Sequence, residues 1–425
     1  MNWSAARAWF GRGRQSAILQ RGAVLAAAGF AASAGAQPSF QGLGFLNDEG
    51  FGPGIAYAVT PDGSVVVGES VSPNGFEAFR WTESEGMVGL GDIPGGYFAS
   101  FAYAVSGDGS VVAGASDDGS AGEGGAAFMW TAADGMIPIG SLGGPTTYGQ
   151  GQGISLDGSV IVGGSQSPRG IEAFRWTAAG GMVSLGDLAG GEVLARATAC
   201  SGDGSVVVGY GSSSGTFDEA FVWTEQTGMV GLGGPGRSAL LAVSRDGQVG
   251  AGQRAGLAVR WTQSTGFVNL GRLAGSGQSI DIASSISGDG LVVGGLADFN
   301  ATKGTGEAFI WDEVEGIRSL RDVLVEAGLG SELIGWSLFD VRGISQDGST
   351  LVGYGFHGSE QEPWIARLPR ACRADFNGDG AVNTLDVLEF LNAFADGDAG
   401  ADFDGNGVVD TRDVLAFLNV WAADC

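Results

Sequence analysis

The stretch AYAVTPDGSVVVGESVSPNGFEAFRWTESEGMVGLG, at residues 56–91, decides the fold of most of this chain. It holds four apolar runs, at residues 56–59, 64–67, 77–81 and 87–90. The first two runs flank Asp62-Gly63. An Asp-Gly pair between two β-rich runs is a strong hairpin signal, because both central turn residues must tolerate positive φ. The stretch therefore predicts a sheet of four strands.

The same pattern recurs along the chain. Its Asp-Gly pairs begin at Asp62, Asp108, Asp157, Asp203, Asp246, Asp289 and Asp347. Its tryptophans follow at Trp81, Trp130, Trp176, Trp223, Trp261, Trp311 and Trp364. Seven units share about 330 residues, or about 47 each, which is close to the length of a four-stranded propeller blade. We therefore predict a mostly β fold in which residues 40–369 form a seven-bladed β-propeller.

The ends of the repeat region indicate how this propeller closes. After Trp364 the chain has no closing strand that ends in Leu-Gly, whereas residues 40–46 contain such a strand before the first unit. If that strand completes the seventh blade, no sheet edge is left open to aggregation. We expect a closed propeller rather than an open solenoid. In the longest interval between repeats, residues 321–327 precede Gly328 and predict one or two helical turns, either as a surface decoration or as a binding lid.

Two near-copies of another pattern end the chain, DFNGDGAVNTLD at 375–386 and DFDGNGVVDTRD at 402–413. Each has oxygen-bearing side chains at its first, third, fifth, ninth and twelfth positions and glycine at its sixth, the spacing that wraps backbone around a hard cation. With the backbone carbonyl of the seventh position, the predicted ligands of the first site are Asp375, Asn377, Asp379, Ala381, Asn383 and Asp386. Those of the second site are Asp402, Asp404, Asn406, Val408, Asp410 and Asp413. The sequence thus predicts two Ca²⁺ sites and no other cofactor.

A helical face follows each loop. The segment at 395–401 between the two units is too short, and too rich in Gly and Asp, to hold a helix that enters the second loop. We therefore expect a small α-helical domain made of two loop-helix units. A segment of only 54 residues buries little apolar surface and needs added stabilisation. Because the loops gather three and four carboxylates, Ca²⁺ should help to fold it.

This duplicated unit, with Asp at the twelfth position, resembles a type I dockerin, the calcium-dependent module that binds cohesin domains. The resemblance covers residues 372–425 and implies that the tenth and eleventh loop positions face the cohesin. These partner-binding positions are Thr384, Leu385, Thr411 and Arg412. The resemblance also implies a disulfide between Cys372 and Cys425, as in GC-type dockerins. The alternative is a calcium-stabilised tail with no partner.

Residues 1–36 carry four arginines and no acid, then a small apolar run that ends in Ala34-Gly35-Ala36. This pattern predicts a secretory signal peptide cleaved after Ala36. No later stretch is apolar enough to span a bilayer. Without the signal the chain has 17 basic and 47 acidic residues, a net charge of −30, which argues against nucleic acid and anionic membranes as partners. We expect a secreted or extracellular protein, free or associated with a cell surface, in a compartment where a disulfide can form.

The repeats resemble the extracellular HAF repeat family over nearly all of residues 40–369, in units such as Glu172-Ala173-Phe174-Arg175-Trp176-Thr177. The family offers no established activity. Glutamate occupies the place of the family's His at Glu77, Glu172, Glu219 and Glu307. We interpret this repeated Glu as a solvated strand end, or alternatively as part of an acidic ring. The repeated Asp of Asp-Gly is interpreted as turn chemistry and the tryptophans as contacts that hold blades together.

Residues suited to catalysis are sparse. The only histidine is His357, for which we expect a loop position, so a Ser-His-Asp or Cys-His mechanism would depend on that residue. Cys200 stands where other repeats carry Val105 and Val243 and predicts a small apolar core slot. We assign no catalytic residue.

These observations favour a secreted, non-catalytic propeller that binds protein or glycan and docks to a cohesin-bearing scaffold or surface through its calcium module. The alternative is a dockerin-borne enzyme of polysaccharide breakdown, either a glycoside hydrolase or a lyase. Paired carboxylates of glycosidase type depend on three-dimensional distance. A non-repeated acid pair in a propeller pocket would favour the enzyme, and a channel lined by equivalent residues would favour the binder.

Overall fold

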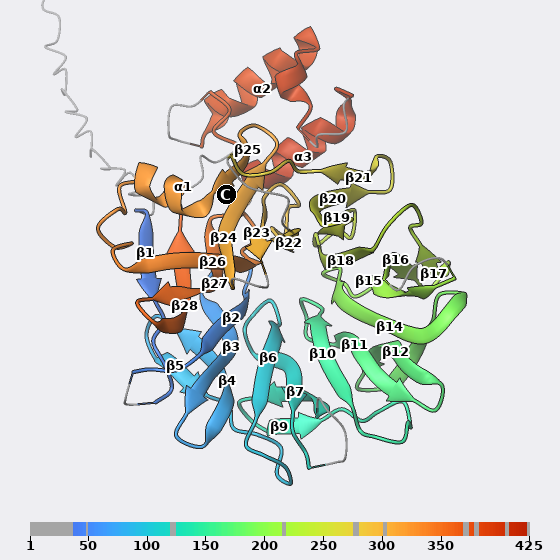
Figure 1. The fold of residues 1–425 in the computed structure, drawn as a ribbon. Helices are drawn as coiled ribbons and strands as arrows, with labels where there is room; N and C mark the ends of the chain where they lie inside the picture. Colours follow the sequence, from blue (N-terminus) through green and yellow to red (C-terminus); the bar gives the residue numbers. More distant parts are fainter. Residues whose placement is uncertain are drawn as a thin grey trace, which may run out of the picture. The chain divides into compact units, whose positions relative to one another are not determined.

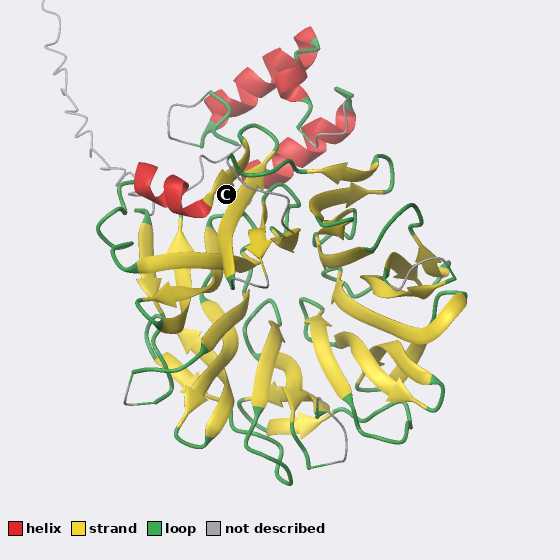
Figure 2. Cartoon of the chain, in the orientation of Figure 1, coloured by secondary structure: helices red, strands yellow, loops and turns green. Residues whose placement is uncertain are grey.

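The computed structural model describes residues 37–47, 50–119, 125–214, 218–274, 280–300, 304–368, 374–377, 382–403 and 408–422. The predicted signal peptide lies outside these ranges. Strands and tight turns make up most of the described chain, and the helices lie in one short segment between strands and in the C-terminal region (Figure 1 and Figure 2). The predicted mostly β fold is confirmed. Within the described ranges, no helix combines the length and the apolar character needed to cross a membrane.

The strands form four-stranded antiparallel sheets that follow one another along the chain. The first two sheets contain β2 (Gly54–Val59), β3 (Val65–Ser72), β4 (Gly75–Thr82) and β5 (Gly86–Gly89), then β6 (Ser100–Val105), β7 (Val111–Ser116), β8 (Ala126–Thr131) and β9 (Gly135–Pro138). An eight-stranded sheet follows, with β10 (Gly149–Ile154), β11 (Val160–Ser167), β12 (Gly170–Thr177), β13 (Gly181–Gly186), β14 (Gly190–Cys200), β15 (Val206–Ser213), β16 (Glu219–Thr224) and β17 (Gly228–Gly231). One parallel pair, Ile171 with Leu194, joins its two antiparallel halves.

Three further four-stranded sheets complete the β region. They contain β18 (Ser238–Val243), β19 (Val249–Arg254), β20 (Leu257–Thr262) and β21 (Gly266–Asn269), then β22 (Ile280–Ile286), β23 (Val293–Asn300), β24 (Thr305–Asp312) and β25 (Gly316–Ser319). The last sheet contains β26 (Trp336–Ile344), β27 (Thr350–His357), β28 (Glu360–Arg367) and, from the start of the chain, β1 (Ser39–Gly42).

The strand β1 pairs antiparallel with β28 and supplies the outer strand of the last sheet. The N–H of Leu43 donates to the carbonyl of Pro363 at 2.8 Å, as Leu90 donates to Ala78 in the first sheet at 2.8 Å. Gly44, in turn, donates to Glu362, as Gly91 donates to Glu77. The predicted completion of the last sheet by an N-terminal Leu-Gly strand is confirmed.

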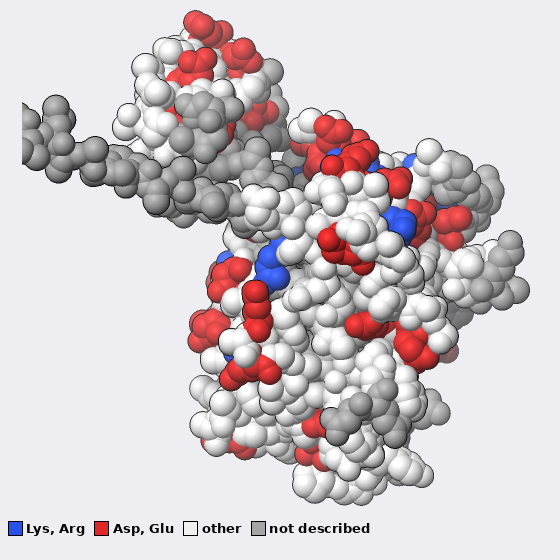
Figure 3. All heavy atoms as spheres, turned by 90° about the vertical axis from the view of Figure 1, so that its left-hand side faces the viewer, with Lys and Arg blue, Asp and Glu red and all other residues white. Residues whose placement is uncertain are grey.

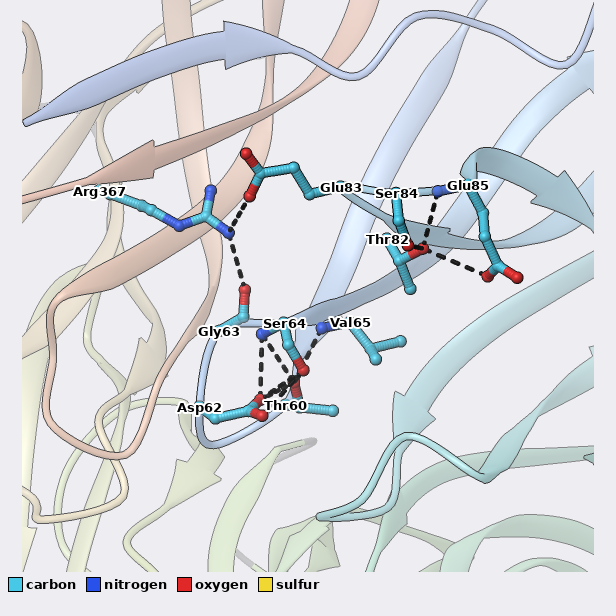
Figure 4. Close-up of polar contacts among 10 residues, drawn as sticks. All are labelled: Thr60, Asp62, Gly63, Ser64, Val65, Thr82, Glu83, Ser84, Glu85 and Arg367. Carbon is cyan, nitrogen blue, oxygen red and sulfur yellow. Dashed lines mark hydrogen bonds and ion pairs between the residues drawn. The ribbon is translucent and has the colours of Figure 1, made fainter. Parts of the chain in front are cut away.

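Further contacts join the last sheet to the first. Arg367 donates from Nη2 to the carbonyl of Gly63 at 3.1 Å and lies 3.9 Å from Glu83 (Figure 4). The N–H of Gln346 donates to the carbonyl of Pro61 at 2.9 Å. The β region is therefore a propeller-like arrangement of sheets whose first and last members are in contact.

The Asp-Gly turns are held by their own side chains. In the first turn, Oδ1 of Asp62 accepts from the N–H of Ser64 at 3.0 Å and from the hydroxyl of Thr60 at 2.6 Å (Figure 4). Gly63 has a φ of 70°, which a residue without Cβ adopts at no steric cost. Matching bonds from Ser106 and Ser110 lower the pKa of Asp108 to about 2. The predicted turn role of the repeated Asp is confirmed.

The seventh tryptophan is out of register with the other six. Trp364 pairs with Gly353, just as Phe79 pairs with Gly68, whereas Trp81 pairs with Val66. The prediction that Trp364 matches the other tryptophans is therefore wrong by two residues. Trp364 is fully buried and packs against Phe40 of β1, with ring centroids 6.1 Å apart. The larger ring fills the core of a sheet that includes a strand from the start of the chain.

The predicted helix between the last two sheets is confirmed as α1 (Leu320–Glu326), which begins after Ser319. Its expected role as a surface decoration, or as a lid, is corrected by its burial. Leu320 and Leu324 are fully buried in one cluster with Trp336 and Trp364. The segment is part of the hydrophobic core of the last two sheets.

The C-terminal region contains α2 (Thr384–Asp396), a short 3₁₀ turn η1 (Ala399–Ala401) and α3 (Thr411–Ala422). Phe390 of α2 and Phe417 of α3 stack in parallel, with ring centroids 4.2 Å apart, and both are fully buried. Phe376 and Phe403 meet this pair edge-on. The helices therefore share a hydrophobic core of their own. Acidic side chains are widespread on the face of the molecule in Figure 3, and basic side chains are sparse there.

Candidate functional site

Each helix of the C-terminal region begins beside a buried carboxylate. Asp386 and Asp413, at the twelfth positions of the predicted loops, are fully buried. Asp386 accepts hydrogen bonds from the N–H of Asn377 at 3.2 Å and from the N–H of Asn383 at 2.7 Å. Asp413 accepts one from the N–H of Asp410 at 2.7 Å. These bonds fold each loop back against the first turn of its helix.

The ninth positions of the loops cap the same helices. Oδ1 of Asn383 accepts from the N–H of Leu385 at 2.8 Å, and Oδ1 of Asp410 accepts from the N–H of Arg412 at 2.7 Å. Such side-chain oxygens satisfy N–H groups that have no partner within the helix. Asn383 and Asp410 were predicted as metal ligands, and the structure gives them a capping role as well.

The described residues include eight of the predicted calcium ligands, Asp375, Asn377, Asn383, Asp386, Asp402, Val408, Asp410 and Asp413. The other four, Asp379, Ala381, Asp404 and Asn406, lie outside the described residues, as do Cys372 and Cys425. In the described ranges no group of three or more His, Cys, Asp or Glu is gathered as a metal site. The donors that are present are oxygens only, and a buried carboxylate needs a compensating charge. This donor set fits a hard cation such as Ca²⁺.

The positions predicted to face a partner are exposed in both units. Thr384 and Leu385 begin α2, and Thr411 and Arg412 begin α3. Leucines continue this exposed surface along each helix, with Leu388 at 56% and Leu415 at 63% exposure. Leu391 and Leu418 are exposed as well. Since both pairs are separated by the 27-residue repeat, the two helices present equivalent apolar faces.

The β region contains a second candidate site, a cavity of about 440 Å³. The first strand of each four-stranded set contributes to its wall, and we call these the inner strands: β2, β6, β10, β14, β18, β22 and β26. Its volume lies within the range of pockets that hold small molecules.

Each inner strand carries a β-bulge, where the pairing with the second strand skips one residue. The skipped residues, which we call the ring residues, are Tyr57, Tyr103, Gln152, Thr198, Leu241, Ser284 and Arg342. All of them line the cavity. A bulge redirects its extra side chain, so the same local distortion directs one residue from each inner strand to the cavity wall.

One side of the cavity wall carries ionisable groups. Arg342 Nε lies 2.7 Å from Oδ2 of the fully buried Asp340, and Ser284 donates to the same oxygen at 3.3 Å. Tyr57 and Tyr103 stand beside each other, with ring centroids 5.2 Å apart. Glu69 of β3 is only 8% exposed and interacts electrostatically with both tyrosines. The cluster therefore spans four of the sheets.

Burial raises the pKa of the Glu69 carboxyl to about 7, although a hydrogen bond from Tyr57 and the positive charge of Arg342 both act to lower it. Burial likewise raises the pKa of Asp340 to about 6, although the positive charge of Arg342 acts to lower it. Perturbed carboxyls beside a cavity are typical of functional sites. The sequence interpretation missed both acids, although one signal was present. Glu69 stands where the neighbouring repeats carry Ala115 and Gly164, so it is not part of the repeated pattern.

The other singled-out residues have structural roles. Cys200 ends β14 and packs against a hydrophobic cluster, which confirms its apolar slot, and burial raises the pKa of its thiol to about 12. His357 is the last residue of β27 rather than a loop residue, and it stacks on Trp336 with centroids 4.7 Å apart. The predicted loop position is therefore wrong, because a strand pair extends to the end of this hairpin.

The solvated strand end predicted for the repeated glutamates is wrong for Glu172, which is buried, and holds for Glu307, which is exposed; all four accept hydrogen bonds. Glu77 accepts from the N–H of Gly91 and Glu219 from that of Gly233, both at 3.0 Å. Glu172 accepts from the hydroxyls of Ser167 and Ser184, and Glu307 accepts from that of Ser319. Each glutamate thus binds groups within its own sheet, and Glu77 and Glu219 hold the chain where it leaves the fourth strand.

No protein-family model and no curated protein matches the chain. Among solved structures, TolB from Acinetobacter baumannii is similar at 15% identity and a TM-score of 0.41, over 63% of this chain and 63% of that one, which is less than two thirds of its length. Oligogalacturonate lyase from Vibrio parahaemolyticus is similar at 10% identity and a TM-score of 0.49, over 79% of this chain and 98% of that one. An oligogalacturonate lyase in complex with manganese has 11% identity and a TM-score of 0.49, over 79% and 97% of the two chains.

Proposed function

We propose that this protein is a secreted, non-catalytic seven-bladed β-propeller that binds protein or glycan and is anchored to a cohesin-like domain or surface scaffold by a calcium-dependent, dockerin-like module. The propeller part of the proposal is supported by the sheet topology, since each repeat supplies one four-stranded antiparallel set. Pairing of β1 with β28 and the contacts from Arg367 to Gly63 support a closed arrangement.

The observation that carries the docking role is the equivalence of the two loop-helix units. Both helices start at a buried twelfth-position Asp, meet through the stacked Phe390 and Phe417, and expose leucines at matching positions. Exposed apolar residues on a small, otherwise acidic region are typical of an interaction surface. The equivalence favours a partner over a tail whose only role is stabilisation.

Bound Ca²⁺ would supply positive charge that neutralises the carboxylates gathered in each loop. In the first loop the described side chains that would hold it are Asp375, Asn377, Asn383 and Asp386, and in the second they are Asp402, Asp410 and Asp413. Asp386 and Asp413 already bind loop N–H groups, so they link the metal loop to the start of the exposed helix. Export, indicated by residues 1–36, would provide both Ca²⁺ and the conditions for a disulfide between Cys372 and Cys425.

The docking proposal is tested with the full mature chain, residues 37–425. Calorimetric titration with Ca²⁺, on oxidised and reduced protein, should give two bound ions per chain. A panel of type I cohesin domains is then tested for binding with Ca²⁺ and with a chelator. Asp386→Ala with Asp413→Ala should abolish both activities, whereas Leu388→Glu with Leu415→Glu should abolish only cohesin binding. Absence of Ca²⁺ binding would overturn the module, and Ca²⁺ binding without any cohesin would leave a calcium-stabilised tail.

A second candidate function, polysaccharide breakdown, is favoured by one observation. Glu69 and Asp340 are buried acids close to the cavity that do not belong to the repeated pattern. Their raised pKa values suit general acid or base chemistry near neutral pH. The test is release of new reducing ends, or of unsaturated sugar products, from polysaccharides. Turnover that is lost in Glu69→Gln and Asp340→Asn would support the enzyme, and absence of turnover by the wild type would support the binder.

A further inference from the structure

The position that follows each ring residue is small for a structural reason, and it carries Ala, Gly or Ser in all seven inner strands. A Cβ added to Gly153 would lie 2.9 Å from the Cα of Ala199, and one added to Gly343 would lie 3.1 Å from the Cα of Ala58. Neighbouring inner strands therefore approach each other so closely that these positions accept only small side chains. Packing between sheets therefore dictates which residue follows each ring residue.

The ring residues are not constrained in this way. Each is the extra residue of a bulge and faces the cavity, and their identities differ widely, from Leu241 to Arg342. If the cavity wall served packing alone, a repeated apolar residue would suffice, as at the position of Val59, Val105 and Ile154. The chemical variety at the ring position is best explained by contact with a ligand that has no symmetry of its own.

The polar ring residues offer mostly hydrogen-bond acceptors. Gln152 donates to Gln150 at 3.1 Å, Thr198 donates to the carbonyl of Leu240 at 2.8 Å, and Ser284 donates to Asp340. One N–H of the Gln152 amide and the hydroxyl hydrogens of Thr198 and Ser284 are in use, so the side-chain oxygens of these residues present lone pairs to the cavity. Such acceptors match the hydroxyl groups of a saccharide.

Among the residues that the structure describes, Arg342 is the one charged residue that lines the cavity, in a chain with a net charge of −26. Its Nε faces Asp340, and its side chain is 37% exposed. A guanidinium has five N–H donors in a planar fork, so that of Arg342 can pair with Asp340 through Nε, interact with Tyr354, whose ring centroid is 5.8 Å from Cζ, and still present a terminal N–H to a ligand carboxylate. The acids Asp340 and Glu69 lie behind the wall and do not line the cavity.

We propose that the cavity enclosed by the inner strands binds the end of a carboxylated saccharide, with its carboxylate on Arg342 and its hydroxyls on Gln152, Thr198 and Ser284. Tyr57 and Tyr103 add aromatic surface beside the guanidinium. This inference rests on the glycan-binding part of the proposed function and is independent of the docking part, because no residue of the C-terminal region lines the cavity.

The experiment measures binding of four probes to the full mature chain: the trimers of galacturonic acid and of glucuronic acid, and the uncharged trimers of galactose and of glucose. Titrations are run with Ca²⁺ and with a chelator, so that failure of the calcium module is seen separately. At least one acidic trimer should bind about tenfold or more tightly than its uncharged counterpart, as expected for one charge-assisted contact.

Three single variants locate the site. Arg342→Gln should weaken binding of the acidic trimer about tenfold or more and leave that of the uncharged trimer nearly unchanged. Arg237→Gln is the matched control, because Arg237 also pairs with an aspartate, Asp218, but its side chain is 72% exposed and lies outside the cavity wall. Gln152→Leu removes an acceptor without touching the ion pair, so it tests the site even if Arg342→Gln fails to fold.

The proposal is supported if the acidic trimer is preferred and both cavity variants weaken its binding while the control does not. Equal binding of acidic and uncharged trimers overturns the carboxylate assignment. Binding that survives both Arg342→Gln and Gln152→Leu overturns the cavity as the site, and so does absence of binding by all four probes. None of these results depends on whether a cohesin is captured.

Discussion

The β region and the C-terminal helical region are both built from repeats, but they differ in which repeated positions stay the same. In the helical region the two copies agree at the buried Asp386 and Asp413 and at the exposed Leu388 and Leu415, and they differ at the predicted partner position of Leu385 and Arg412. In the β region the agreeing positions hold the fold, and the ring residues differ in every repeat but the first two, which both carry Tyr. Identical positions thus indicate function in one region and packing in the other.

This difference follows from what each region would bind. Two Ca²⁺ ions are identical ligands, so two copies of a loop must present oxygen donors at the same positions, although Asn and Asp exchange at the third, fifth and ninth positions. A saccharide held on the axis of a repeated structure meets each repeat with a different group, so the wall must vary. The predictions below test this contrast, beginning with the largest effect.

Removal of Ca²⁺ should unfold the helical region and leave the β region folded. At about a hundredfold excess over the dissociation constant, each ion contributes about 2.7 kcal/mol, which is about 5 kcal/mol for two sites. Hydrogen exchange on the full chain should show loss of protection in α2 and α3 after chelation, with β2 to β4 unchanged as the internal control. Equal protection of α2 with and without Ca²⁺ would show that the Phe390–Phe417 core keeps the helical region folded without bound metal.

Glu69→Gln should change the pH dependence of stability. A buried carboxyl with a raised pKa binds a proton more readily in the folded state than in the unfolded state. The contribution of Glu69 to the stability of the wild type should therefore be fully present below about pH 4.5 and be lost as pH rises through about 7. The change is of order 2–3 kcal/mol between these limits. Urea denaturation at pH 5 and pH 8 should show a smaller difference for the variant.

The pH dependence of stability of Glu69→Gln also has a consequence for binding in the cavity. If Glu69→Gln shows the same slope as the wild type, the charge of Glu69 is compensated in the folded state and cannot influence Arg342. If the slope is reduced as expected, binding of the acidic trimer should also tighten in the wild type as pH falls towards 6, because protonation of Glu69 removes a negative charge near the guanidinium. Tyr57 and Arg342 are the groups that act on Glu69, and Asp340, whose pKa burial raises to about 6, titrates in the same range beside Arg342.

Glu362→Ala and Glu77→Ala compare the last sheet with the first. Each glutamate accepts from a glycine N–H next to a fourth strand, but in the last sheet that glycine, Gly44, belongs to the start of the chain. Loss of the bond should cost about 1–2 kcal/mol at either site. Only Glu362→Ala should also increase hydrogen exchange in β1, because its bond joins segments 318 residues apart. Equal exchange in both variants would show that β1 is held by its pairing with β28 alone.

Most of the fold could be predicted from short-range signals. Asp62-Gly63, the Val-rich runs and the orphan Leu-Gly strand each act within a hairpin or a strand pair, and the structure confirms them. The register of Trp364 could not, because it depends on Phe40, a residue far away in the chain. The same holds for part of the cavity site: Asp340 lies two residues from Arg342 on β26, but Glu69 of β3 approaches Arg342 only when the first and last sheets meet. The segment 56–59 did carry one visible signal, a large residue between two alanines, and its meaning depended on a bulge that no local pattern revealed.

The smallest effect should appear in the Asp-Gly turns, where the repeats come closest to being identical. Asp108 accepts from two serine hydroxyls, whereas Asp246 accepts from one, because Gln248 replaces the second serine. Asp108→Asn should therefore cost about 0.5 kcal/mol more than Asp246→Asn, a small figure because these turns are exposed and solvent weakens their interactions. The lowered pKa of Asp108 also makes the effect depend on pH. The contribution of the Asp108 carboxylate to stability is present above about pH 4 and is lost as pH falls towards 2. Urea denaturation of both variants at pH 7 and pH 3 measures the difference, which should shrink at the lower pH. A difference that persists unchanged would show that the serine hydroxyls stabilise the turn without the aspartate charge.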